Sequence, residues 1–183
     1  MVKMKKAIFG GSFDPPHIGH LAIIMQALSS LDIDELIVVP AFLNPFKSKS
    51  YAPAELRLKW LTIMTEKLPK VKISSFEIDQ NRAVASIETV RHFKDKHDDI
   101  YFIIGADNLA SLRQWNSFEA LDEMVTWVVA TRDAIKIPKK YLTLKVDHDI
   151  SATQLREQVQ EAYLDKNIAK EIITYYKDLS LKK

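Results

Sequence analysis

Hydrophobic residues follow two alternating patterns along this chain. Short continuous apolar runs, several of them rich in Val and Ile, are typical of strands buried in a parallel sheet. Between these runs, apolar residues recur with the period of amphipathic helices. The predicted strands are Lys6–Phe9, Glu35–Pro40, Lys70–Phe76, Ile100–Ile104, Val125–Thr131 and Leu142–Val146. The predicted helices are Ile18–Leu31, Ala54–Leu68, Ile87–Lys96, Phe118–Met124, Ala152–Tyr163 and Ile168–Leu179.

The alternation of strand and helix predicts the fold class. Strand–helix–strand units build an α/β fold in which helices cover both faces of a doubly wound parallel sheet. In such folds, ligands bind at the carboxyl ends of the strands, where the strand order reverses. The chain has 183 residues and neither a repeat nor a low-complexity linker. We therefore expect one domain, 1–183, whose last part, from about 151 to 183, is helical.

Composition excludes several classes of site and partner. The net charge of +2 gives no ground to expect a nucleic acid or an anionic membrane as partner. The absence of cysteine rules out disulfides, thiolate zinc sites and cysteine nucleophiles. The N-terminal lysines precede too few apolar residues for a signal peptide, and no run has the length of a membrane span. We expect a cytoplasmic protein that binds small molecules; the oligomeric state stays open, a homo-oligomer included.

The stretch from Ala7 to Ile24, AIFGGSFDPPHIGHLAII, concentrates unusual residues after the first predicted strand. It holds three of the chain's four glycines and two of its five histidines. Gly10 and Gly11 permit backbone angles and a close approach that a Cβ would forbid. The helix that follows offers unpaired N–H groups and the positive end of its dipole, which suit phosphate. Taken alone, the two glycines are more simply explained by a plain tight turn without a ligand.

The two histidines favour the anion site. His17 and His20 are three residues apart, so they share a face of the predicted helix. A metal pair lacks the spacing and glutamate of the metalloprotease motif, and no cysteine completes a zinc site. A purely structural pair at the start of a helix is a second alternative. The third alternative is that both rings donate hydrogen bonds to a phosphoryl group during its transfer.

Two motifs carry a family resemblance. GSFDPPHIGH, from Gly11 to His20, resembles the G-[ST]-F-D-P-x-H-x-G-H motif of the H-x-G-H nucleotidyltransferases. ISATQLR, from Ile150 to Arg156, is similar to their second motif, I-S-[ST]-T-x-[IL]-R. Locally, Ser151 and Gln154 fit a capping box. Arg156 near the predicted helix start suggests a compensating anion, because the dipole disfavours a cation there.

The middle of the chain narrows the resemblance to one family. Phe102–Leu109, FIIGADNL, followed by Trp115 and then Val128–Arg132, resembles the bacterial nicotinate-nucleotide adenylyltransferases. Two segments depart from that family's pattern. Asn44-Pro45-Phe46-Lys47 stands where Pro-Pro-His-Lys is common, and Val84-Ala85-Ser86 stands where Ser-Tyr-Thr is common. A third departure is Ala152, which stands in place of a serine.

The resemblance implies a fold, a reaction and a set of roles. The fold is a Rossmann-like single nucleotidyltransferase domain with C-terminal helices. The reaction is adenylyl transfer from ATP to nicotinate mononucleotide, which gives deamido-NAD and pyrophosphate in NAD biosynthesis, with Mg²⁺ on the ATP. The implied catalytic residues are His17, His20, Lys47 and Arg156. The implied nucleotide-binding residues are Gly10, Gly11, Ser12, Phe13, Gly105, Asp107, Ser151 and Thr153. The implied acceptor-binding residues are Asn44, Thr89, Trp115 and Arg132, and no residue is predicted as a metal ligand.

Local sequence leaves alternatives at several of these positions. Asp107 is equally suited to accept hydrogen bonds from ribose hydroxyls or to cap the next short helix. Trp115 either stacks on the pyridine ring or belongs to the core. We expect Trp60 and Trp127 to belong to the core. Arg132, at a strand end, faces either substrate or solvent. For the whole protein, the alternatives are a related transferase with nicotinamide mononucleotide, phosphopantetheine or a cytidylyl donor, and a non-catalytic nucleotide-binding regulator.

Overall fold

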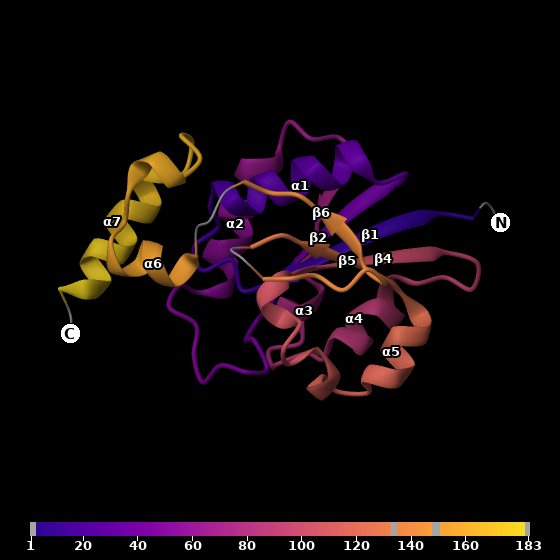
Figure 1. Cartoon of the computed structure of the whole chain (residues 1–183). Helices are drawn as coiled ribbons and strands as arrows, with labels where there is room; N and C mark the ends of the chain where they lie inside the picture. The colour runs from indigo at the N-terminus through magenta and orange to yellow at the C-terminus, as the bar shows by residue number, and fades with distance from the viewer. Residues whose placement is uncertain (1–2, 133–134, 148–150, 182–183) are drawn as a thin grey trace.

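A computed structural model describes residues 3–132, 135–147 and 151–181 of the chain. Within these residues, six strands form one parallel sheet in the order β3-β2-β1-β4-β5-β6 (Figure 1). The strands are β1 (Lys5–Gly11), β2 (Glu35–Pro40), β3 (Val71–Ile73), β4 (Asp99–Gly105), β5 (Thr126–Ala130) and β6 (Leu142–Leu144). The predicted parallel sheet is confirmed, and the strand order reverses between β1 and β4.

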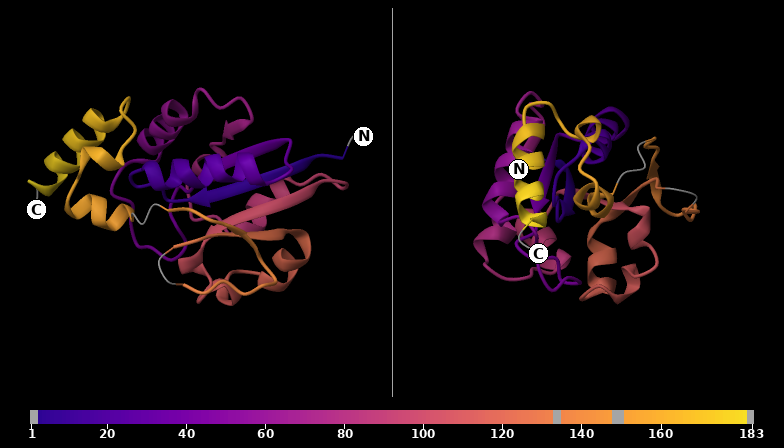
Figure 2. Two further views of the ribbon diagram at one scale, coloured as in Figure 1. Left: turned by 45° about the horizontal axis from the view of Figure 1, so that its top comes forward. Right: turned by 90° about the vertical axis from the view of Figure 1, so that its left-hand side faces the viewer.

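Helices cover both faces of the sheet, as predicted. They are α1 (Ile18–Ser30), α2 (Ala54–Thr65), α3 (Phe76–Asp79), α4 (Ser86–Phe93), α5 (Phe118–Met124), α6 (Ala152–Glu157) and α7 (Ala169–Ser180). Short 3-10 turns span Ala106–Asn108, Leu112–Gln114 and Glu161–Tyr163. Figures 1 and 2 show α1 and α2 on one side of the sheet and α4 and α5 on the other.

The pleat of the central strands divides the buried side chains between two cores. Ala7 and Phe9 of β1 join the cluster beneath α1 and α2, whereas Ile8 joins the cluster beneath α4 and α5. Leu36 and Ile37 of β2 divide in the same way. Successive side chains of a strand point to opposite faces, so a strand buried on both faces is apolar throughout. This is the physical basis of the short continuous runs in the sequence.

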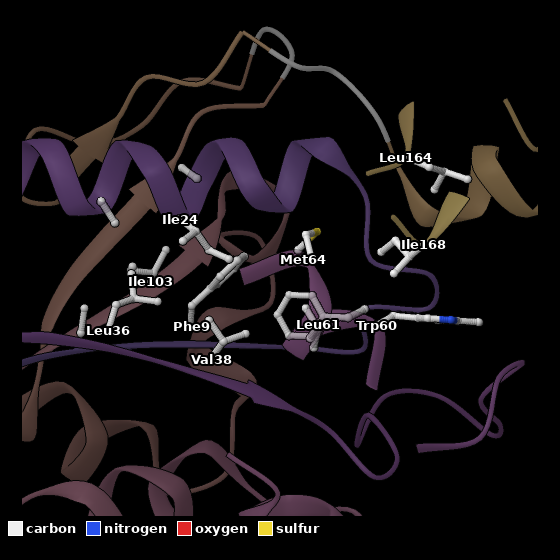
Figure 3. Close-up of a cluster of buried hydrophobic side chains, with 14 of the residues drawn as sticks. Phe9, Ile24, Leu36, Val38, Trp60, Leu61, Met64, Ile103, Leu164 and Ile168 are labelled. Atoms are coloured by element: carbon white, nitrogen blue, oxygen red, sulfur yellow. The ribbon is translucent and has the colours of Figure 1, made fainter. Parts of the chain in front are cut away.

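The C-terminal segment shares the first of these cores. Leu164 and Ile168 are buried in the same cluster as Trp60 of α2, and Figure 3 shows them beside Met64 and Trp60. The Trp60 ring also contacts Tyr175 of α7, with ring centroids 5.9 Å apart. Trp60 and Trp127 are both buried, as expected for core residues.

Several predicted elements are shorter in the structure, and two of them have an evident physical reason. The strand Lys70–Phe76 ends at Ile73 because Ser74 turns the chain, its hydroxyl accepting a hydrogen bond from the Phe76 N–H at 3.2 Å. Phe76 then begins α3. The helix Ala152–Tyr163 ends at Glu157. The break redirects the chain so that Leu164 can reach the core, and this tertiary packing overrides the local helical period.

Within the described residues, no helix is long and apolar enough to cross a membrane.

Candidate active site

A cavity of about 770 Å³ opens at the carboxyl ends of β1 and β4. This is the position at which the strand order reverses and at which α/β folds bind ligands. Every candidate site residue named from the sequence lines this cavity. They are Gly10, Gly11, Ser12, Phe13, His17, His20, Asn44, Lys47, Thr89, Gly105, Asp107, Trp115, Arg132, Ser151, Thr153 and Arg156. Ile150, the first residue of the second motif, lies outside the described residues.

The glycines of the first motif provide space rather than unusual backbone angles. Neither Gly10 nor Gly11 has a positive φ; the left-handed conformation falls on Phe13, with φ of 47°. A Cβ on Gly10 would come no closer than 3.9 Å to another protein atom, the carbonyl oxygen of Val39. The prediction that these glycines are required for special backbone angles was therefore wrong. A Cβ on Gly11 would lie 3.2 Å from the ring of Phe13, and close approach by a ligand to these glycines stays a prediction.

His17 and His20 cap the first turn of α1 with their own side chains. His17 is the N-cap residue, and its Nδ1 accepts a hydrogen bond from the Gly19 N–H at 3.1 Å. His20 Nδ1 accepts a hydrogen bond from the His17 N–H at 3.1 Å. The two rings stack with centroids 3.7 Å apart. In a neutral imidazole whose Nδ1 accepts, the proton sits on Nε2. The cap therefore fixes both rings as Nε2–H donors.

The surroundings of the two rings keep them neutral. Burial, followed by the charge of Arg132, lowers the pKa of His17 to about 3. Burial also lowers the pKa of His20 well below its usual value, with further contributions from His17 and Arg132. Both rings are neutral donors at pH 7. The structural alternative, a capping role at the start of the helix, is confirmed for both side chains, and their Nε2–H groups are compatible with the phosphate-donor alternative.

The loop between β1 and α1 is held by Asp14, a motif residue to which the sequence assigned no role. Its buried carboxylate accepts hydrogen bonds from the N–H groups of Tyr51 at 2.7 Å and Ala52 at 3.0 Å. It also accepts one from the hydroxyl of Tyr176 in α7. Asp14 thereby joins the first motif to the loop Ala41–Pro53 and to the C-terminal helix.

Arg57 makes a second connection between the same loops. Its side chain is fully buried on the inner face of α2. It donates hydrogen bonds to the carbonyl oxygens of Ser12 at 2.5 Å, Phe42 at 3.1 Å and Ala52 at 3.1 Å. Because Arg57 stands three and four residues before Trp60 and Leu61 on the apolar face, this spacing was the signal that could have identified it.

Two cations from different segments of the chain converge on the first motif. Lys47 Nζ lies 3.3 Å from the hydroxyl of Ser12, and burial and the charge of Arg156 lower its pKa. Arg156 Nη1 donates to the Asp14 carbonyl at 2.6 Å, and Nη2 donates to Thr153 Oγ1 at 3.0 Å. The guanidinium also lies over the ring of Tyr51, 4.4 Å from its centroid. Positive charge therefore gathers beside the glycine turn.

The second motif is a capped helix, as its sequence indicates. Ser151 Oγ accepts a hydrogen bond from the Gln154 N–H at 3.1 Å, and Gln154 Oε1 accepts from the Ser151 N–H at 3.0 Å. The dipole interpretation of Arg156 was wrong, however. Because α6 ends at Glu157, Arg156 lies in its last turn, where the helix dipole favours a cation.

Asp107 and Arg132 lie at the ends of neighbouring strands and pair with each other. The Arg132 Nη1 atom is 3.4 Å from Asp107 Oδ2. The N-cap alternative for Asp107 was wrong, because Gly105 occupies the N-cap position of the turn Ala106–Asn108. A Cβ on Gly105 would come within 2.5 Å of Asp107 Oδ1. Glycine thus leaves room for the carboxylate at the cavity edge.

The other side of the cavity is formed around α4. Trp115 is half-buried, and its ring contacts Phe102 at 6.3 Å between centroids. It both lines the cavity and packs against the core, so the two alternatives for Trp115 are compatible. Thr89 is buried and donates a hydrogen bond to Glu77 at 2.5 Å. Glu77 lines the cavity as well, and nothing in its local sequence distinguished it from its neighbours.

Three comparisons with known proteins relate this geometry to a family. The family model described as cytidylyltransferase-like matches residues 8–158. The probable nicotinate-nucleotide adenylyltransferase of Sulfurimonas denitrificans is 54% identical over 172 residues, covering 94% of each chain. That of Campylobacter fetus is 46% identical over 177 residues, covering 96% of this chain and 98% of the other.

A solved structure extends the likeness to the fold. Plasmodium falciparum nicotinic acid mononucleotide adenylyltransferase complexed with NaAD superposes with a TM-score of 0.77 at 22% identity. The match covers 95% of this chain and 98% of that one. At this identity the likeness shows the fold alone, a parallel α/β domain. Together with the sequence matches over nearly the whole length, it shows that the chain belongs to the cytidylyltransferase-like family and, within it, to the nicotinate-nucleotide adenylyltransferases.

Proposed function

We propose that this protein transfers the adenylyl group of ATP to nicotinate mononucleotide, yielding deamido-NAD and pyrophosphate for NAD biosynthesis. The observation that carries this proposal is the pair of neutral histidines whose Nδ1 atoms are occupied by the backbone. Both Nε2–H donors remain for phosphate oxygens at the edge of a cavity that is also lined by three cations, Lys47, Arg132 and Arg156. This arrangement suits a phosphoryl centre on which charge develops.

The reaction needs no protein nucleophile. An oxygen of the acceptor's phosphate attacks the α-phosphorus of ATP and forms a new P–O bond. The bond from that phosphorus to the bridging oxygen of the β-phosphate breaks, and pyrophosphate leaves with the electron pair. Because the attacking oxygen is already ionised at neutral pH, the protein contributes positioning and charge stabilisation.

The residues around the first motif take the phosphate roles in this proposal. His20 donates from Nε2 to the α-phosphate, and His17 donates to a neighbouring phosphate oxygen. Lys47 and Arg156 stabilise charge on the β- and γ-phosphates, an assignment supported by their convergence on the Ser12–Asp14 loop. The turn at Gly10, Gly11, Ser12 and Phe13 lets the phosphates approach the backbone, and Ser151 and Thr153 contribute from the second motif.

The remaining cavity residues divide between the two nucleosides. Asp107 accepts hydrogen bonds from ribose hydroxyls in the space that Gly105 leaves open. Arg132, which lies against Asp107, orients that carboxylate and adds positive charge to the cavity. Trp115 stacks on the pyridine ring, and Thr89 lies at the same end of the cavity. Asn44 also lines the cavity, and its Oδ1 accepts from the Phe46 N–H at 2.9 Å, which fixes the loop.

Magnesium fits this site as an ion that arrives on ATP. The described residues contain no group of three His, Cys, Asp or Glu side chains placed to hold a metal ion. Mg²⁺ commonly keeps water ligands and binds substrate phosphates without a protein cage. Bound in that way, it would neutralise charge on the phosphate oxygens. The lysine, arginine and histidine donors described above act on the same phosphates.

The shared core supports treating 1–183 as one domain with a helical C-terminal part. Leu164 and Ile168 pack into the cluster that also holds Phe9 and Ile24. The C-terminal helices therefore depend on the nucleotide-binding core for their burial.

Pyrophosphate release from ATP, measured with each acceptor in turn, tests the function. We expect release with nicotinate mononucleotide and much slower release with nicotinamide mononucleotide or phosphopantetheine. CTP in place of ATP should give little product. Faster release with another acceptor would reassign the substrate, and no release with any acceptor would support a nucleotide-binding regulator.

A further inference from the structure

Glu77 is a buried carboxyl group that the proposed mechanism does not use. It lies in α3, lines the cavity and is 8% exposed. Its Oε1 accepts the hydrogen bond from Thr89. Within the described residues, Glu77 has no ion-pair partner and Oε2 has no hydrogen-bond partner. One oxygen is therefore held by the protein and the other is available to a ligand.

The position of Glu77 associates it with the acceptor. The only hydrogen-bond partner of its carboxyl group within the described residues is Thr89, which lines the same cavity from α4. The neighbouring wall is made of small or apolar residues, Val84, Ala85 and Ser86. A wall of this kind suits the flat pyridine ring assigned to this end of the cavity, and Glu77 supplies an ionisable group to it.

Burial decides the charge of this group. It raises the pKa of Glu77 to about 7; the hydrogen bond from Thr89 opposes the shift, and the negative charge of Glu88 adds to it. Near neutral pH the group therefore exists in two forms. The protonated form can donate a hydrogen bond, and the ionised form can only accept.

The charged groups around Glu77 do not prevent it from existing in both protonation forms near neutral pH. On α4, Glu88 is paired with Arg82 at 2.7 Å, and His92 is exposed and stacks on Phe76. On α3 itself, Asp79 is exposed and accepts from the Ser75 hydroxyl at 2.8 Å.

Further charged groups near Glu77 lie on the neighbouring strand and in the rest of the cavity. β2 packs against α3, and its charged residue, Glu35, lies at the opposite end of the strand from the cavity. The other charged groups that line the cavity are Lys47, Asp107, Arg132 and Arg156. In the proposed function they act on phosphates and ribose, which are the same whichever pyridine mononucleotide is the acceptor.

We propose that the carboxyl group of Glu77 recognises the 3-substituent of the acceptor's pyridine ring. When Glu77 is protonated it favours an acceptor with a carboxylate, and when Glu77 is ionised it favours an acceptor with a carboxamide. This inference rests on the proposed function and specifies how its acceptor is chosen. A protonated Oε2 donates to the pyridine carboxylate. An ionised Oε2 repels that carboxylate but accepts from the N–H₂ group of a carboxamide. At a pH above the pKa of Glu77, the carboxyl group takes up a proton from solvent when the acidic acceptor binds. The proton returns to solvent when the acceptor leaves.

The acceptor preference should then depend on pH. The ratio of kcat/KM for nicotinate mononucleotide to that for nicotinamide mononucleotide should fall as the pH rises on both sides of about pH 7, by up to about tenfold per pH unit. Both acceptors carry the same phosphate, so its titration cancels in the ratio. The titrations of other cavity groups cancel for the same reason.

The matched variants are Glu77→Gln and Asp79→Asn. Glutamine keeps the acceptor for Thr89 and presents an N–H donor at every pH, so the ratio should become independent of pH in Glu77→Gln. Asp79→Asn makes the same chemical change on the exposed side of α3 and should keep the wild-type profile. A wild-type ratio that does not change with pH would overturn the proposal, whether or not Glu77→Gln folds. So would an unchanged profile in a folded Glu77→Gln.

Calorimetry provides a readout that does not depend on turnover. Nicotinate mononucleotide is titrated into the wild-type protein at about pH 8, in buffers with different ionisation enthalpies. We expect net proton uptake in the wild type and in Asp79→Asn but none in Glu77→Gln. Equal uptake in all three proteins would contradict the role of Glu77. If the wild type transferred adenylyl groups to neither mononucleotide, the proposed function itself would fail, and that outcome is distinct from these.

Discussion

The guanidinium of Arg57 donates a hydrogen bond to the backbone carbonyl of Ser12, 45 residues earlier in the chain, at 2.5 Å. Its other donors reach the carbonyls of Phe42 and Ala52 at the two ends of the loop that carries Lys47. One buried side chain therefore fixes both segments that approach the phosphates. Such rigid support keeps catalytic donors within a small distance of their productive positions.

Replacing Arg57 by lysine should destabilise the protein by about 2–4 kcal/mol. A lysine cannot serve three carbonyls at once, and each buried acceptor left without a partner costs about 1–3 kcal/mol. Urea unfolding measures the change. The exposed Arg113→Lys is the control and should shift stability by less than about 0.5 kcal/mol. Equal stability of both variants would show that the three hydrogen bonds contribute little.

His17→Asn should separate the two roles of His17. Asparagine is a good N-cap, so the variant should stay within about 1 kcal/mol of the wild type in unfolding free energy. It lacks the Nε2–H donor, so kcat should fall by about two orders of magnitude. His17→Ala should lose both the cap and the activity. If His17→Asn kept full turnover, His17 would have a structural role alone.

His20→Ala should lower turnover by about two to three orders of magnitude and leave the fold intact. The reason is the loss of the neutral donor proposed to act on the α-phosphate. Circular dichroism checks the fold, and initial rates of pyrophosphate release check the turnover. A rate near that of the wild type would remove His20 from the chemical step.

Acidification should destabilise the protein through His17. Its folded-state pKa of about 3 lies below the ordinary value near 6.5, so between these values the unfolded chain binds the proton more readily. Stability is fully present above pH 6.5 and falls as the pH decreases towards about 3. This histidine should contribute about 2 kcal/mol of loss between pH 7 and pH 5. In His17→Asn the loss measured by urea unfolding should be smaller by that amount; an identical loss would refute the assignment.

Arg156→Ala should raise the KM for ATP more than the KM for the mononucleotide. Arg156 stands beside the first motif, where it holds the Asp14 carbonyl and is proposed to face the triphosphate. Arg113→Ala, an exposed arginine outside the cavity lining, should leave both constants unchanged. Equal increases in the two constants would argue for a general effect on the loop rather than for triphosphate binding.

The sequence alone determined the architecture and the location of the site. Residues Glu35–Pro40 were predicted as a strand and Phe118–Met124 as a helix with the bounds that the structure has. These elements were predictable because burial on one or two faces leaves a period in the chain that is independent of distant contacts. The motif from Gly11 to His20 placed the site at the end of the first strand for the same local reason.

Only the tertiary structure decided how the site is held and which groups titrate in it. Asp14 and Tyr176 are 162 residues apart in sequence, and neither residue indicates locally that they are hydrogen-bonded. The helix predicted over Ala152–Tyr163 breaks because the buried positions of Leu164 and Ile168 are set by α2 and β1. The burial of Arg57, the lowered pKa values of the histidines and the Glu77 oxygen that has no partner among the described residues likewise depend on other elements. Hydrogen bonds and desolvation act between neighbours in space, so these properties arise only when the elements are packed together.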